Sequence, residues 1–340
     1  MKSLYELIKD YSSISFIGMC KNAGKTTTLN QLIKELRDAG VVFGATSVGR
    51  DGESTDLVTD TVKPGIFVYK DTVLATAANL LKECDITKEI LKTTGIYTPM
   101  GEIILLRALS DGFVQLAGPS ITTQLVGMFE EFREFGAEKM LVDGALGRKS
   151  LCSRKVSEST ILCTGASYHK SMDRVVADTA YTCELLQLPE ADVYLPEEDL
   201  SKLGKYLPLQ ADRSVEIPEK PYKLEQLWNP RRKHLPTEIY VQGGMTDAMI
   251  RPALTSGADF RGKRLIFRDG SKILLSSDMY EKLTSRGLSF AVQDAIHLLG
   301  VTINPFSAYG FHFDKDVFKK RMQEAVTVPV YNVRDAYDVK

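Results

Sequence analysis

Hydrophobic and polar positions along the first 190 residues alternate between two spacings. Short apolar runs such as Ile14–Gly18 predict buried strands, and segments whose apolar residues recur three and four apart, such as Lys25–Ala39, predict helices. Further strands are expected at Val41–Val48, Ile66–Tyr69, Met140–Val142 and Thr160–Thr164, and further helices at Thr72–Leu81, Ile121–Phe135 and Lys170–Gln187. This alternation predicts an α/β fold whose mostly parallel sheet is flanked by helices on both faces.

A turn signal separates two further apolar runs. Ser110-Asp111-Gly112 combines residue types that favour tight turns. We therefore expect a β-hairpin formed by Glu102–Leu109 and Phe113–Ala117.

The pattern changes between Leu188 and Pro236, where seven prolines are interspersed with charged residues. Such a segment predicts an irregular connection. Beyond it, strands are expected at Glu238–Gln242, Arg264–Phe267, Phe290–Val292 and Val328–Asn332, and helices at Thr246–Ser256, Asp278–Arg286 and Asp314–Ala325. Pro329 makes the last strand an edge strand, because proline has no backbone N–H. We expect a larger domain over 1–190, a proline-rich connection over 191–235 and a smaller α/β domain over 236–340.

Composition narrows the class of protein. The chain has 340 residues, 44% of them hydrophobic, and a net charge of −1, so it is an ordinary globular chain and not a dedicated nucleic-acid binder. No uncharged apolar run approaches the ~20 residues that span a membrane, and Glu6 interrupts any signal-peptide core. These two features predict a cytoplasmic protein. The five cysteines are widely spaced, which predicts reduced thiols and no zinc site.

The segment from Gly18 to Thr27 carries the clearest chemistry. It follows a predicted strand and opens a predicted helix, the context in which backbone N–H groups bind phosphate. The candidate nucleotide-binding residues of this phosphate loop (P-loop) are Gly18, Lys21, Asn22, Ala23, Gly24, Lys25, Thr26 and Thr27. Lys25 would reach the β- and γ-phosphates, and the Thr26 hydroxyl would bind Mg²⁺. The alternative is a chance Gly-Lys-Thr at a helix start.

Two carboxylates are candidates for the same site. Asp143 ends an apolar run and precedes small residues, and Asp51 follows the second predicted strand. Either would hold Mg²⁺ or its waters, and Asp51 would alternatively orient the attacking water. Lys25, Asp51 and Asp143 are therefore the candidate catalytic residues, and Thr26, Asp51 and Asp143 the candidate metal ligands. The alternative for Asp143 is an ordinary Asp-Gly turn.

Further charged residues near this predicted site, and the choice between ATP and GTP, can also be read from the sequence. Glu53 is the alternative candidate for the role of Asp51. Arg50 and Arg148 either neutralise charge on the γ-phosphate or are simply solvated. The chain lacks the Asn-Lys-x-Asp tetrapeptide with which GTPases read guanine, which favours ATP.

Gly18 and Gly24 are separated by five residues, one more than in the common phosphate loop. This spacing resembles dethiobiotin synthetase and the cobyrinate amidases, which belong to the MinD-type branch of P-loop proteins. The segment around Asp143 is similar to Val-Glu-Gly-Ala-Gly-Gly of dethiobiotin synthetase. The branch often uses a loop lysine that crosses to a dimer partner. Lys21 is the candidate for that role in a homodimer, and a solvated lysine is the alternative.

Several segments together resemble a narrower family, the ATP-binding subunit of the lysine 5,6-aminomutase reactivase. These segments lie at 18–30, 46–53, 116–120, 142–150 and 160–166. The resemblance implies a chaperone-like, Mg²⁺-dependent ATPase that exchanges damaged cobalamin in an adenosylcobalamin-dependent aminomutase. It also implies a second, MutS-like ATPase subunit as partner. The sequence itself has no Asp-x-His-x-x-Gly cobalamin motif.

Two other functions stay open from the sequence. One is a carboxylate ligase like dethiobiotin synthetase, which would use ATP to activate a small acid. An amidase is disfavoured, because the expected second domain has no cysteine. The other is a nucleotide sensor or scaffold that binds ATP without turnover. The sequence shows no second catalytic set outside the phosphate loop, which favours an ATPase that serves a partner protein.

Overall fold

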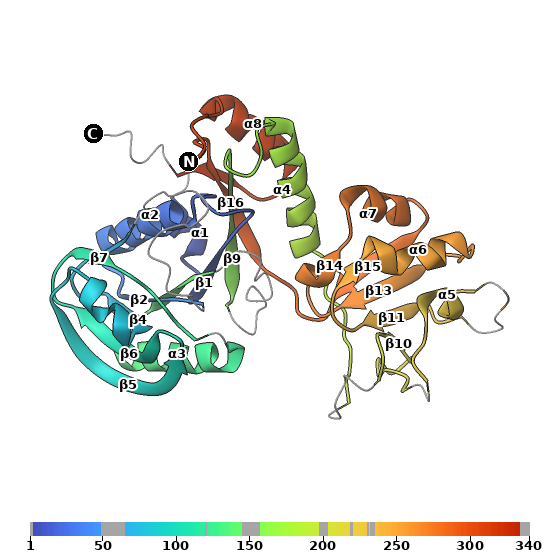
Figure 1. Ribbon diagram of the computed structural model, residues 1–340, viewed down its shortest axis with the longest axis horizontal. Coiled ribbons are helices and arrows are strands. Elements are labelled where there is room, and N and C mark those ends of the chain that lie inside the picture. Colours follow the sequence, from blue (N-terminus) through green and yellow to red (C-terminus); the bar gives the residue numbers. More distant parts are fainter. Residues whose placement is uncertain are drawn as a thin grey trace. The chain divides into compact units, whose positions relative to one another are not determined.

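The computed structural model describes residues 3–48, 65–119, 121–144, 157–196, 203–217, 220–229, 231 and 235–333. The chain divides into two compact units (Figure 1). Unit 1 comprises Met1–Ala180 and His297–Lys340, and unit 2 comprises Tyr181–Ile296. No helix in the described part of the chain is both long and apolar enough to cross a membrane.

Unit 1 is built on a nine-stranded sheet with the order β17-β16-β9-β1-β8-β2-β4-β6-β5. The strands are β1 (Ser13–Gly18), β2 (Phe43–Ser47), β4 (Val73–Ala77), β5 (Lys88–Thr98), β6 (Gly101–Ala108), β8 (Lys139–Asp143), β9 (Ser159–Gly165), β16 (Leu298–Asn304) and β17 (Val330–Asn332). Neighbours from β17 to β4 are parallel, whereas β6 is antiparallel to β4 and β5. The expected α/β fold with a mostly parallel sheet is confirmed.

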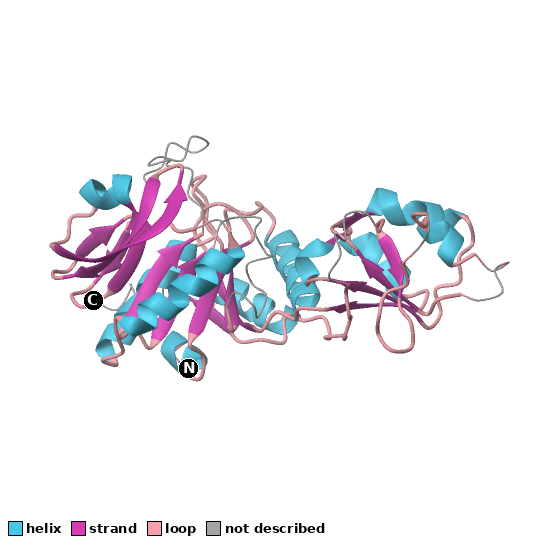
Figure 2. Cartoon of the chain, turned by 90° about the horizontal axis from the view of Figure 1, so that it is seen from below, coloured by secondary structure: helices cyan, strands magenta, loops and turns pink. Residues whose placement is uncertain are grey.

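Helices cover both faces of this sheet (Figure 2). On one face, Ile14 and Phe16 of β1 belong to a core that includes helices α1 (Leu4–Ile8) and α2 (Lys25–Asp38). On the other face, Met140 and Val142 of β8 share a core with α3 (Thr122–Glu134). Side chains alternate between the faces of a strand, so strands that are covered on both sides, such as β4 and β9, are buried at every residue.

The expected helix over Thr72–Leu81 is wrong. Its first half is strand β4, and a 3₁₀ helix follows at Ala78–Glu83. Asp71, just before β4, has a left-handed backbone with φ 72°. Every residue of β4 is buried between β2 and β6, so tertiary pairing overrides the local helical spacing.

The expected hairpin at Ser110–Gly112 is also wrong. The turn is present, but β7 (Gly112–Val114) pairs with β3 (Ile66–Val68). β6 forms its hairpin with β5 instead. β5 was not predicted because its residues are exposed or half-buried, so its sequence lacks the apolar signal of a core strand.

The division into units differs from the expected domains. Strands β16 and β17, with helix α8 (Lys315–Ala325) between them, extend the sheet of unit 1. β16 pairs with β9, and Val301 is in register with Leu162. In Figure 1, β16 accordingly lies beside the green β9. The segment 297–340 therefore completes the first sheet, and unit 2 is an insertion. β17 is an edge strand, as Pro329 predicts.

Unit 2 has a sheet of its own, with the order β10-β11-β13-β15. Its elements are β10 (Tyr206–Pro208), α5 (Leu224–Leu227), β11 (Glu238–Val241), β12 (Met245–Thr246), α6 (Asp247–Thr255), β13 (Lys263–Phe267), β14 (Ile273–Leu274), α7 (Ser277–Thr284) and β15 (Leu288–Val292). Helix α4 (Met172–Leu186) leads into it from unit 1.

The proline-rich segment is part of unit 2, not a connection between domains. One face of the unit 2 sheet packs on α5, α6 and α7. On the other face, Val193, Leu203 and Val215 pack against Tyr240 and Ile266 of the central strands. The segment buries apolar surface in place of helices and stabilises the unit.

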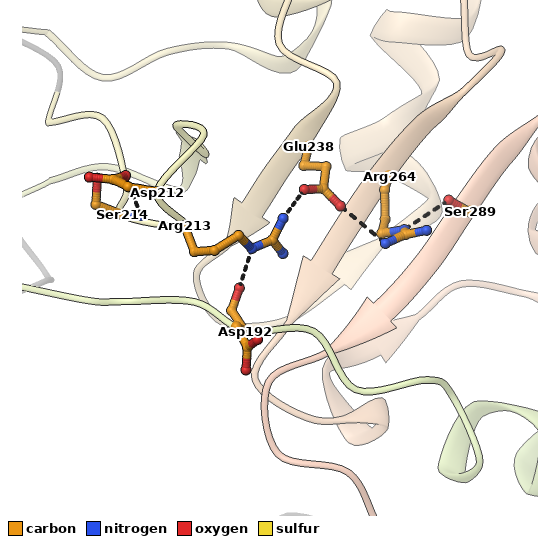
Figure 3. Close-up of polar contacts among 7 residues, drawn as sticks. All are labelled: Asp192, Asp212, Arg213, Ser214, Glu238, Arg264 and Ser289. Atoms are coloured by element: carbon orange, nitrogen blue, oxygen red, sulfur yellow. Dashed lines mark hydrogen bonds and ion pairs between the residues drawn. The ribbon is translucent and has the colours of Figure 1, made fainter.

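A charged network joins the amino ends of the unit 2 strands (Figure 3). Glu238 on β11 accepts a hydrogen bond from Arg213 and another, at 3.1 Å, from Arg264 on β13. Arg213 also donates to the backbone oxygen of Asp192 at 2.9 Å, and Arg264 to Ser289 of β15 at 3.4 Å. One carboxylate thus holds two guanidinium groups and links three strands with the segment at 192.

Replacing Glu238 with alanine is expected to destabilise unit 2 by about 1–2 kcal/mol, because the half-buried Arg213 and the more exposed Arg264 lose their shared carboxylate. Trp228 reports on this unit alone, since it is the only tryptophan, is fully buried and donates to the Pro236 oxygen. Urea unfolding followed by tryptophan fluorescence measures the change. Asp259→Ala is the control because its partner Arg261 is exposed. Equal midpoints for the two variants would contradict the stabilising role of the network.

Candidate functional site

The loop between β1 and α2 contains two left-handed residues. Asn22 has φ 59° and Gly24 has φ 94°, and Gly24 caps α2 without a side-chain hydrogen bond. The first amides of a helix have no partner within the helix. Together with the helix dipole, such amides make the start of a 14-residue helix favourable for an anion.

Lys25, the first residue of α2, lies back over the end of β1. A Cβ atom placed on Gly18 would stand only 3.0 Å from the Lys25 Nζ. Glycine at position 18 therefore leaves room for the lysine side chain. This contact brings together two residues that the sequence analysis assigned to phosphate binding, and it places an ammonium group over the loop.

Asp143 ends β8, the strand beside β1. It is in register with Phe16 of β1 and Ser47 of β2, and its backbone oxygen accepts a hydrogen bond from Val48 at 3.1 Å. Its Oδ1 atom is buried. Gly144 follows directly and donates to the Phe16 oxygen at 2.9 Å. A Cβ on Gly144 would stand 2.4 Å from that oxygen, so only glycine fits this close approach.

Lys25 and Asp143 both act electrostatically on one buried thiol. Burial is the main cause that raises the pKa of Cys163; the Lys25 charge lowers it, and the Asp143 charge raises it further. Cys163 lies on β9, on the other side of β1 from β8. The lysine and the carboxylate are therefore close to the same strand ends, which is the arrangement expected from parallel strands.

The other predicted site residues differ in their exposure to solvent, and some lie outside the described residues. Lys21 is exposed, Ala23 is buried, and Thr26 and Thr27 are half-buried in the first turn of α2. Asp51, with Arg50, Glu53 and Arg148, lies outside the described residues. Among the residues that the structure describes, no group of three or more histidine, cysteine, aspartate or glutamate side chains forms a metal site. A cation here would need phosphate or water oxygens beside Thr26 and Asp143.

One strand end that lies close to the loop was not predicted from the sequence. Asn304 ends β16, and a Cβ on Gly24 would stand 3.1 Å from the Asn304 Cβ. Two residues earlier, Thr302 shares a 2.9 Å hydrogen bond with Thr28 of α2. The apolar run 298–303 before Asn304-Pro305 is a strand signal that could have revealed this edge of the site.

Tyr168 and Cys20 are coupled electrostatically near the loop. Tyr168 donates to Asp178 at 2.9 Å, and burial, followed by this hydrogen bond, raises its pKa to about 12. The Cys20 charge also contributes to that increase. Burial raises the pKa of Cys20 to about 11, although the Lys25 charge opposes the shift.

Cys20 is therefore expected to react slowly with iodoacetamide. The raised pKa keeps the thiol protonated at pH 8, so the thiolate fraction falls about a hundredfold relative to an ordinary cysteine. Peptide mass spectrometry after timed alkylation measures the rate, and Lys34→Cys provides a control thiol on the exposed face of α2. Similar rates at pH 8 would contradict the burial of the Cys20 thiol.

Comparison with models of known protein families finds no match for this chain, and comparison with curated proteins finds none. The geometry of the site therefore carries the functional argument.

Proposed function

We propose that the loop between Gly18 and Thr27 is a P-loop that binds Mg·ATP. The contact of Lys25 with Gly18, at the start of a helix capped by a left-handed glycine, carries this proposal. Amides and an ammonium group that converge on one loop suit a polyphosphate. The absence of the guanine-reading tetrapeptide favours ATP over GTP.

Different residues of the chain would have different roles in ATP hydrolysis. Lys25 neutralises charge on the β- and γ-phosphates, and Thr26 with Asp143 holds the metal or its waters. Bound Mg²⁺ would supply stabilisation of the charge that develops on the phosphates. Asp51 is proposed as a further carboxylate for the metal or for the attacking water.

We infer further that this ATPase serves a protein partner. The described residues offer no separate metal cluster for a second chemistry. Unit 2 is a separately cored insertion between α4 and β16, which suits docking to another protein. Together with the resemblance at 46–53 and 142–150, this supports an ATP-binding reactivase subunit for an adenosylcobalamin-dependent aminomutase. Its proposed partners are the mutase and a MutS-like subunit, in the cytoplasm.

A reactivation assay tests this function. An aminomutase inactivated by turnover is mixed with this protein, its second subunit, Mg·ATP and fresh adenosylcobalamin. We expect recovery of activity that requires ATP, because hydrolysis would reset a mutase complex that ATP binding has opened. Lys25→Ala should give no recovery, and Lys34→Ala, on the exposed face of the same helix, should match the wild type.

The same assay separates the competing functions. ATP turnover stimulated by a small carboxylic acid, without recovery of a cognate mutase, would indicate a ligase of the dethiobiotin synthetase type. ATP binding with negligible turnover in every mixture would indicate a sensor.

A further inference from the structure

The end of β16 is linked to the β1–α2 loop through both of its polar residues. Thr28 of α2 donates its hydroxyl to the Gly24 oxygen at 3.0 Å and shares a hydrogen bond with Thr302 at 2.9 Å. Both threonines are buried. β16 therefore reaches the residue that caps α2 through a buried hydroxyl pair.

The Asn304 side chain lies close beside Gly24 and is itself held in place. Its backbone oxygen accepts from the Ala166 amide at 2.9 Å, and its Oδ1 accepts from the Phe306 amide at 3.2 Å. Since Oδ1 is engaged in this turn, the Nδ2 group is the one free to donate on the side of the loop. Nδ2 stands 3.9 Å from where a Gly24 Cβ would be, and the Asn304 Cβ is closer still.

These contacts restrict the left-handed turn at Gly24. A backbone with φ 94° is strained for any residue except glycine, and the Asn304 side chain occupies the space beside it. The loop can hold its amides toward a ligand only while this turn persists.

We propose that Asn304 is a positioning residue for the phosphates, which acts through Gly24 and keeps the loop in its anion-binding shape. This inference rests on the proposed function. It also implies that the segment after unit 2 is needed for nucleotide binding, because β16 enters the sheet only after the insertion.

The experiment compares three variants of the full chain. Asn304→Asp preserves the shape and the acceptor for Phe306 but places a negative charge beside the loop. Asn304→Ala removes the carboxamide without adding charge. Ser307→Ala is the matched control, since Ser307 makes a similar turn in the same loop by accepting from Tyr309. Calorimetry with Mg·ATP, ADP and adenosine, the KM and kcat of hydrolysis, and the melting temperature are measured for each.

We expect Asn304→Asp to weaken Mg·ATP binding at least tenfold, to weaken ADP binding less and to leave adenosine unaffected, because repulsion grows with the charge of the ligand. KM should rise more than kcat falls, and the melting temperature should stay near that of the wild type. Asn304→Ala should show a smaller loss, and Ser307→Ala none.

The outcomes separate this inference from the function on which it rests. A wild-type protein that binds no Mg·ATP overturns both. A wild type that binds Mg·ATP, with Asn304→Ala of equal affinity, overturns the positioning role alone, whatever loss the added charge causes in Asn304→Asp. Equal losses for Asp and Ala, in step with lower melting temperatures, would make Asn304 a purely structural residue and would also overturn it.

Discussion

Lys25→Ala is expected to lower the affinity for Mg·ATP by about a hundredfold or more, because the β- and γ-phosphates lose their main cation. The structure places the lysine Nζ against the glycine that ends β1, so no side chain stands between the ammonium and the loop at that point. Isothermal titration calorimetry at fixed Mg²⁺ measures the change.

The control for this experiment lies on the same helix. Lys34 is exposed on α2, and Lys34→Ala removes the same charge at a distance from the loop. It should bind Mg·ATP like the wild type. If Lys25→Ala also binds with wild-type affinity, the loop is not a phosphate site. A GTP titration of the wild type should give weaker binding than ATP.

Asp143→Asn is expected to lower kcat for ATP hydrolysis about a hundredfold or more while nucleotide affinity changes only a few-fold. The substitution retains the shape of the side chain and removes the charge that would hold the metal. Charge on the phosphates develops most in the transition state, so the loss appears in turnover and not in binding. Steady-state hydrolysis gives kcat, and calorimetry on the same preparation gives the affinity for nucleotide.

Glu138→Gln provides the matched control, because Glu138 is exposed just before the opposite end of strand β8. Its turnover should equal that of the wild type. Unchanged turnover in Asp143→Asn would make Asp143 an ordinary turn residue. Asp51→Asn is the parallel variant for the second proposed carboxylate.

The local part of the site could be predicted from sequence because its signals are adjacent in the chain. An apolar run ending at Gly18, followed by Gly24-Lys25 and a helical spacing, specifies a strand, a loop and a helix. Asp143 could be placed by one further step, since parallel strands end at a common edge. The structure has Asp143 in register with Phe16 of the neighbouring strand.

The nonlocal part could not be predicted in this way. Asn304 lies far from Gly24 along the sequence, and the local sequence around either residue does not indicate that the two are close in space. The predictions for β5 and β4 were wrong for opposite reasons. No residue of β5 is fully buried, so its sequence lacks the apolar run of a core strand, whereas β4 has apolar residues whose spacing also fits a helix.

The sequence by itself determined the α/β class, most of the helices and strands, and the strand, loop and helix around Gly18–Thr27. Only the tertiary structure decided that 297–340 completes the first sheet, that the proline-rich segment covers a sheet face, and that Asn304 lies against Gly24. The physical reason is that an apolar pattern shows which side of an element is buried but not which element covers it. Hydrogen bonds between strands form with the same backbone groups whatever the sequence, so strand order is settled by packing across the whole chain.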